Sequence, residues 1–174
     1  GKLAIGVTSK DVVLQIIGNI GTAGGTGYVI EYAGTLISDL SVENRMTICN
    51  MTIEGGARAG LIQPDQKIFD YLKGRPMSPK NENWDKALEY WRTLKTDSDA
   101  KFDKEINLTA EDIVPMVTWG TSPQDVAPID GKVPNPENES DIDRKNSIDR
   151  SLKYMGLKPD VAIKDIKIDT VFIG

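Results

Sequence analysis

The chain contains no histidine and only one cysteine among its 174 residues. Without histidine, it cannot supply a Ser-His-Asp or Cys-His catalytic group from its own residues, nor a histidine-based zinc site. A single cysteine can form no internal disulfide, and it cannot hold an iron–sulfur cluster, which usually needs several thiolates. These absences exclude most self-contained catalytic centres, and the low cysteine count favours a reduced, cytoplasmic location.

Long hydrophobic runs are also missing, and none approaches the roughly 18–20 apolar residues of a membrane span. The chain has 21 basic and 26 acidic residues, which gives a net charge of −5. With this balance and no concentrated basic stripe, we expect neither a nucleic-acid partner nor a membrane partner. The 39% hydrophobic share is enough for a folded core, and the length suits one domain, or one domain plus a piece of another.

Apolar periodicity and breaker residues predict helices that alternate with short strands, which is typical of an α/β fold. Ser9 and Ser41 are expected to cap the first two helices. The expected helices cover residues 9–17, 41–53, 65–72, a segment that starts at 83 or 85, and 141–155, with a helical turn at 109–112. The expected strands cover residues 28–33, 104–108 and 166–174.

A proline-rich stretch divides the chain. Four prolines lie between residues 121 and 139, which predicts a loop or an extended linker: Pro123, Pro128, Pro134 and Pro136. We therefore expect an α/β domain at 1–120, a linker at 121–140, and an arm at 141–174 whose helix and strand begin a further domain.

The two ends of the sequence suggest an internal segment of a longer protein. The chain begins at Gly1 without methionine, and it ends in a run, 166–174, that alternates and then becomes apolar. Such a run predicts a strand that enters a core, and a natural protein rarely stops there. A C-terminal edge strand is the alternative.

A glycine cluster, residues 21–27 (GTAGGTG), is the first candidate site. A phosphate-binding loop needs the order strand, loop, helix, so that amide groups and the helix dipole face the anion. Here the predicted order is helix, loop, strand, and neither GK[ST] nor the dinucleotide pattern is present. The favoured interpretation is a helix end and turn rather than a nucleotide site.

Asn50 and Glu54 form the second candidate. On a continuous helix they would lie four residues apart and share one face. An amide and a carboxylate so placed can orient a ligand and move a proton. Small apolar neighbours suggest that Glu54 is partly buried, whereas the plainer interpretation is a solvated pair beside a buried stripe. Cys49, on the same segment, is expected to be a small core residue.

The segment 118–123 (TWGTSP) is the third candidate, because its hydroxyl groups beside a tryptophan suit the wall of a site. A turn that packs one aromatic side chain explains it equally well. The acidic residues between 137 and 149 alternate with lysine and arginine, which is typical of a solvated surface.

Together these segments resemble the large subunits of 3-isopropylmalate dehydratase, a family of the aconitase superfamily. The resemblance extends over nearly the whole chain, with several long motifs in the family's order. It rests on residues 21–34 (GTAGGTGYVIEYAG), 46–60 (MTICNMTIEGGARAG), 71–76 (YLKGRP), 90–95 (YWRTLK), 118–123 (TWGTSP), 154–157 (YMGL) and 171–174 (VFIG).

The resemblance implies a leucine-biosynthesis hydro-lyase that interconverts 2- and 3-isopropylmalate through 2-isopropylmaleate. It implies the second domain of a three-domain aconitase-like iron–sulfur region, with an extended arm. It also implies a [4Fe-4S] cluster in the full-length enzyme, with cluster cysteines after Gly174 and active-site histidines before Gly1. This chain alone is therefore expected to bind no cluster or metal and to be inactive.

Two residues of this chain match functional positions of the family. Asn50 matches an asparagine that hydrogen-bonds near the cluster, so the resemblance implies a catalytic and cofactor-binding role for it. Glu54 matches a glutamate that faces the iron-bound hydroxyl or water, which implies an acid–base role. Cys49 matches a cysteine that is not a cluster ligand, and the glycine cluster matches a structural segment.

The implied partners are a small subunit, or small-subunit domain, and the small-molecule substrate isopropylmalate. Two alternatives remain open. Homoaconitase and related diacid hydro-lyases share much of the same pattern. An autonomous binding or scaffold domain without chemistry is the alternative from another class.

Overall fold

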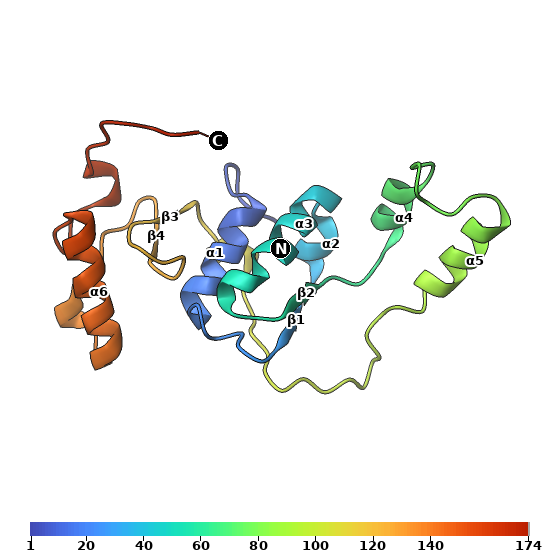
Figure 1. Ribbon diagram of the computed structural model, residues 1–174, viewed down its shortest axis with the longest axis horizontal. Coiled ribbons are helices and arrows are strands. Elements are labelled where there is room, and N and C mark those ends of the chain that lie inside the picture. Colours follow the sequence, from blue (N-terminus) through green and yellow to red (C-terminus); the bar gives the residue numbers. More distant parts are fainter. Residues whose placement is uncertain (174) are drawn as a thin grey trace.

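The computed structural model describes residues 1–173 as a mixture of helices and short strands (Figure 1). The helices are α1 (Ser9–Ile20), α2 (Thr35–Asp39), α3 (Val42–Met51), α4 (Gln66–Leu72), α5 (Glu82–Trp91) and α6 (Ile142–Met155). The strands are β1 (Val29–Glu31), β2 (Ala59–Leu61), β3 (Met116–Thr118) and β4 (Val126–Pro128). Short 3₁₀ turns are η1 (Thr52–Gly55), η2 (Ala110–Asp112), η3 (Pro136–Asn138) and η4 (Ile163–Asp165).

Helix α1 lies at the centre of the molecule and supplies the first core (Figure 1). Its N-cap is Thr8, one residue earlier than predicted, because the Asp11 carboxylate accepts hydrogen bonds from both the Thr8 N–H (2.7 Å) and the Thr8 hydroxyl (2.8 Å). Its apolar face is buried, and Val12 packs in a cluster with Tyr32 and Ile48. The first core therefore joins α1, α3 and the segment that follows β1.

The glycine cluster serves as a close-packed turn between α1 and β1, in the predicted order of helix, loop and strand. The Gly25 N–H donates to the Gly55 carbonyl at 2.8 Å, and a Cβ on Gly25 would lie 2.8 Å from that oxygen. Gly56, at φ +84°, would bring a Cβ within 2.7 Å of the Thr22 carbonyl. These contacts place β1 beside β2 in parallel, with Ile30 opposite Gly60, and they explain the small residues without a ligand.

A second core lies between the β3–β4 hairpin and α6. The two strands pair antiparallel, with Val117 opposite Ala127, and α6 begins at its N-cap Asp141 and ends at Gly156 (φ 65°), as the sequence predicts. The buried side chains of this core are Trp119, Ala127, Val133, Ile148, Leu152 and Ile163.

The segment 121–140, predicted as a linker, takes part in this core. It forms β4 and η3, and Val133 within it is fully buried. The proline-rich composition therefore correctly indicates irregular backbone, but this backbone is packed rather than extended through solvent. The division into domains at 120 and 140 stays a prediction.

Helices α4 and α5 lie to one side of the first core (Figure 1). The predicted helix at 65–72 is confirmed, with Asp65 as its N-cap. Helix α5 packs on α4 through Trp91, which stacks with Phe69 at 6.1 Å between ring centroids. Within α5, Trp84 meets Trp91 edge-on at 5.7 Å. Aromatic packing thus joins two short helices that contribute little else to the cores.

Two predicted strands are wrong. Residues 104–108 and 166–173 form no strand, and Ile106, Val171 and Phe172 are 55%, 74% and 91% exposed. A strand needs a neighbour for its backbone groups, and neither segment has a ladder partner in the described part of the chain. Gly174, the last residue of the second prediction, lies outside the described residues.

Candidate functional site

A cleft of about 530 Å³ lies between the two cores and contains Glu54. Its walls come from the N-terminal turn of α1, the end of α3, and the strand and loop at 116–123. The residues that line it are Thr8, Lys10, Asp11, Leu14, Met51, Glu54, Met116, Val117, Thr118, Gly120, Thr121, Ser122 and Pro123. Two candidate segments that are more than sixty residues apart in sequence therefore meet in one cleft.

Glu54 does not lie on a continuous helix with Asn50. Helix α3 ends at Met51, and Glu54 belongs to the 3₁₀ turn η1, which stops at the left-handed Gly56. The expectation of partial burial is wrong, since Glu54 is exposed. Its small neighbours Gly55 and Ala57 are the buried residues of this segment. The Glu54 side chain lies in the cleft instead.

Asn50 lies in the last turn of α3 and is also exposed. Among the described residues it is not part of the cleft lining, although its neighbour Met51 is. The structure therefore places Glu54 in one cleft with the Thr118–Pro123 loop, while Asn50 lies outside the lining of that cleft. The catalytic and cofactor-binding roles of Asn50, and the catalytic role of Glu54, stay predictions.

Asp11 joins the α1 wall of the cleft to the β3 wall. Its Oδ1 accepts the Met116 N–H at 2.7 Å, while its Oδ2 accepts the two donors of Thr8. Burial alone would raise the pKa of Asp11, but these donated hydrogen bonds outweigh it and hold the pKa below its usual value. Sequence reasoning found Asp11 only as a helix residue, because its partner Met116 is distant in sequence.

The loop 118–123 packs one aromatic side chain and also lines the cleft, while its role as the wall of a functional site stays a prediction. Trp119 turns away from the cleft and is buried in the second core, so the loop does pack one aromatic side chain. Thr118, Gly120, Thr121, Ser122 and Pro123 nevertheless line the cleft. The buried tryptophan anchors the loop, Thr121 Oγ1 pairs with the Ser151 hydroxyl at 3.0 Å, and the residues on either side of the tryptophan share the cleft with Glu54.

Comparison with known protein families gives one result. The model of the aconitase family (aconitate hydratase) matches residues 1–174. The chain belongs to the aconitase family. Membership supports a hydro-lyase as the kind of enzyme, and it agrees with the helix and strand content of the fold.

Aconitase-family proteins generally bind a [4Fe-4S] cluster, so the chain can be tested for ligands to one. Its one cysteine, Cys49, is half-buried on α3, and there is no histidine. Within residues 1–173, no group of three or more acidic, cysteine or histidine side chains is placed to hold a metal ion. These residues do not fit a complete cluster site. In the same range, no helix has the length and apolarity required of a membrane span.

Cys49 is expected to react slowly with alkylating reagents. Burial raises the pKa of its thiol, so less of the reactive thiolate is present at neutral pH. Iodoacetamide labelling at pH 7.5, followed by mass spectrometry, should proceed about tenfold or more slower than labelling of a cysteine peptide. Urea-unfolded chain is the control and should label at the peptide's rate. Equal rates for folded chain and peptide would contradict the burial of Cys49.

Asp11 is expected to make folding stability depend on acid pH. Its folded-state pKa is lowered, so the stabilisation is present above the unfolded value of about 3.9 and is lost as pH falls through the folded value. Asp11→Asn should reduce the free energy of unfolding by about 1–2 kcal/mol at pH 7, because the amide nitrogen cannot accept from Thr8.

Urea titrations between pH 2 and pH 7 measure this effect. The difference between wild type and Asp11→Asn should shrink below about pH 4. Asp149→Asn, on an exposed position of α6, is the matched control and should not change the profile. A difference that stays constant down to pH 2 would show that the carboxylate of Asp11 is not the group that matters.

Proposed function

We propose that this chain is part of the large subunit of 3-isopropylmalate dehydratase, the hydro-lyase that interconverts 2- and 3-isopropylmalate through 2-isopropylmaleate in leucine biosynthesis. Membership of the aconitase family supports the reaction class, and the motifs at 21–34 and 46–60 support this branch of the family. The observation that carries the proposal is the position of Glu54 in the cleft that it shares with the Thr118–Pro123 loop.

Glu54 is the acid–base group in this proposal. Loss or addition of water across a carbon–carbon double bond requires a proton to be delivered to, or taken from, the departing or arriving oxygen. An exposed carboxylate held on a rigid 3₁₀ turn can carry that proton, and the Gly25 and Gly56 contacts fix the turn. Asn50, in the last turn of α3, is proposed to orient the reacting groups.

The family's cluster supplies Lewis-acid chemistry when it is bound. In this proposal its ligands come from parts of the protein outside these 174 residues, because the described residues do not provide them. The partner is a small subunit, or small-subunit domain, and the location is the cytoplasm. The cleft then provides one wall of a shared active site, and the isolated chain is inactive.

The test uses the complete large subunit that carries this segment, reconstituted with its cluster and a small subunit. Hydration of 2-isopropylmaleate and dehydration of 3-isopropylmalate are followed by absorbance of the double bond, with substrates of the homocitrate series compared at equal concentration. Preference for isopropylmalate supports the proposal. Preference for the homocitrate series would instead identify a homoaconitase, and no turnover of any diacid would overturn the hydro-lyase assignment.

A further inference from the structure

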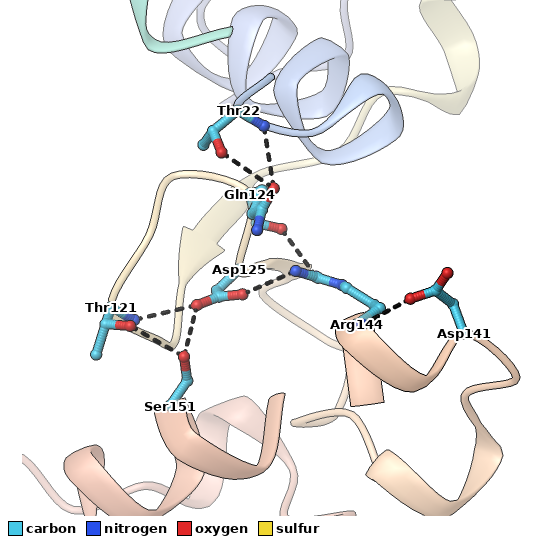
Figure 2. Close-up of polar contacts among 7 residues, drawn as sticks. All are labelled: Thr22, Thr121, Gln124, Asp125, Asp141, Arg144 and Ser151. Atoms are coloured by element: carbon cyan, nitrogen blue, oxygen red, sulfur yellow. Dashed lines mark hydrogen bonds and ion pairs between the residues drawn. The ribbon is translucent and has the colours of Figure 1, made fainter. Parts of the chain in front are cut away.

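The Thr118–Pro123 loop, which shares the cleft with Glu54, is hydrogen-bonded to a buried aspartate, Asp125. The proposed function does not use this residue. Figure 2 shows its contacts, and Asp125 itself is 0% exposed. Its Oδ2 accepts the Thr121 N–H at 3.2 Å and the Ser151 hydroxyl at 3.0 Å. Its Oδ1 accepts from Nη1 of Arg144 at 3.2 Å. A fully buried carboxylate with three donors has a defined orientation.

The backbone of the loop closes on the same residue. The Trp119 N–H donates to the Asp125 carbonyl at 2.9 Å, and the Asp125 N–H donates to the Ser122 carbonyl at 2.9 Å. Gly120 lies so close to the Asp125 side chain that a Cβ there would lie 2.7 Å from the Asp125 Cβ and would clash with Oδ2. Asp125 therefore determines the path of the loop from Trp119 to Ser122.

The loop is also fixed relative to the rest of the cleft. Gln124 Oε1 accepts the Thr22 N–H at 3.0 Å and the Thr22 hydroxyl at 3.3 Å, which connects the loop to the glycine turn after α1 (Figure 2). Ser151 and Arg144, both on α6, hold the opposite side through Asp125. The glycine turn in turn contacts Gly55, next to Glu54.

We propose that Asp125 is a positioning residue for the reaction: it holds the Thr118–Pro123 loop at a fixed distance from Glu54, so that a substrate in the cleft meets both walls at once. This inference rests on the proposed function. Small displacements of a wall that orients the substrate can lower the rate by about 100-fold, even when no reacting group is removed. Asp125 acts through the loop and does not itself contact the substrate.

Three variants distinguish positioning of the loop from a contribution to folding stability alone, because they keep different contacts of Asp125. Asp125→Ala removes all three acceptor contacts. Asp125→Asn keeps a carbonyl oxygen for Thr121 and Ser151 and loses only the ion pair. Arg144→Met removes the ion pair and also the hydrogen bond from Nη2 to the Gln124 carbonyl (3.3 Å), and it leaves the Thr121 and Ser151 contacts of Asp125. If Asp125 served stability alone, activity per folded molecule would be the same in all three variants.

The experiment measures kcat and KM of the complete, cluster-loaded enzyme on isopropylmalate, at a temperature where circular dichroism shows each variant to be folded. Asp125→Ala should lower kcat by about 10–100-fold. Asp125→Asn and Arg144→Met should stay within about threefold of wild type, even with a lower Tm. Equal kcat for Asp125→Ala and wild type would overturn the proposal, as would equal losses in all three variants.

Two further measurements keep the test decisive. If Asp125→Ala does not fold, Gly120→Ala is measured in its place, because the added methyl group would push the loop away from Asp125. A wild-type kcat for Gly120→Ala would overturn the proposal. Hydrogen exchange of peptide 118–125, read by mass spectrometry, should accelerate in the Ala variant and not in Asp125→Asn. If wild type turns over no diacid, the proposed function fails separately, and the exchange comparison still decides whether Asp125 holds the loop.

Discussion

Glu54→Gln in the complete enzyme should lower kcat by roughly 100-fold or more, as is typical for loss of a positioned acid–base group. The substitution keeps the size of the side chain and one carbonyl oxygen, so the η1 turn and the glycine contacts below it are preserved. What it removes is the ability to accept and release a proton at this point of the cleft. Because Glu54 is exposed and has no ion-pair partner among the described residues, stability should not change.

Steady-state kinetics with isopropylmalate, at saturating substrate and over a range of pH, measure this effect. Glu89→Gln, at an exposed position of α5 outside the cleft, is the matched control and should keep wild-type kcat. Unfolding curves of both variants should coincide with that of wild type. If Glu54→Gln turned over at the wild-type rate, the cleft could still bind substrate, but Glu54 would not be its acid–base group.

Local signals in the sequence were sufficient for the capped helices. Asp141 before α6 and Gly156 after it predict both ends of that helix, since a capping carboxylate and a left-handed glycine act within a few residues of the helix end. Asp65 predicts the start of α4 for the same reason. These devices need no information from distant parts of the chain.

The strands show where local signals fail. Residues 166–173 have the alternation of a strand, yet a strand exists only where a neighbour supplies backbone partners, and alternation does not reveal the neighbour. β1 and β2, by contrast, are three residues each and pair because the Gly25–Gly55 contact brings them together. Pairing is therefore a property of the tertiary contacts.

The sequence likewise identified individual residues of the candidate site but not their arrangement in space. Glu54 and the segment 118–123 were both identified from their residue types, but their meeting in one cleft depends on Asp11 bonding to Met116 and on Gln124 bonding to Thr22. Both contacts join residues that are more than 100 positions apart in the sequence, and no local sequence pattern predicts a contact at that separation. Asp125 was missed because an aspartate after a proline turn looks like an exposed turn residue, whereas the structure buries it completely.

Arg45 is a second buried charge that the sequence did not reveal, and its partner is Asp65. The Arg45 side chain is 3% exposed, and its Nη2 donates to Asp65 Oδ2 at 2.6 Å and to the Ser38 carbonyl at 2.9 Å. Its Nε and Nη1 are buried without a partner in the described part of the chain. The hydrogen bond from Arg45 holds the pKa of Asp65 below its usual value. Most of the compensation for this buried charge thus comes from one carboxylate.

Asp65→Ala should therefore be among the most destabilising single substitutions in the chain. It leaves the buried guanidinium with one carbonyl, which costs about 3–5 kcal/mol, and it removes the N-cap of α4, which adds about 1 kcal/mol. Arg45→Met should cost at most about 1 kcal/mol, because it removes the buried charge and leaves Asp65, whose side chain is 32% exposed, to solvent and to the Ile68 N–H. The order of these two effects follows from which partner is buried.

Urea unfolding of the chain at pH 7 measures both variants, together with the double variant and a capping control. Asp141→Ala removes a comparable N-cap, whose Oδ1 accepts the Arg144 N–H at 2.7 Å, and should cost about 1 kcal/mol. The double variant Arg45→Met/Asp65→Ala should be more stable than Asp65→Ala alone, since no unpaired charge remains buried. If Asp65→Ala cost no more than Asp141→Ala, Arg45 would have to find other partners, and the ion pair would not be what stabilises the contact between α3 and α4.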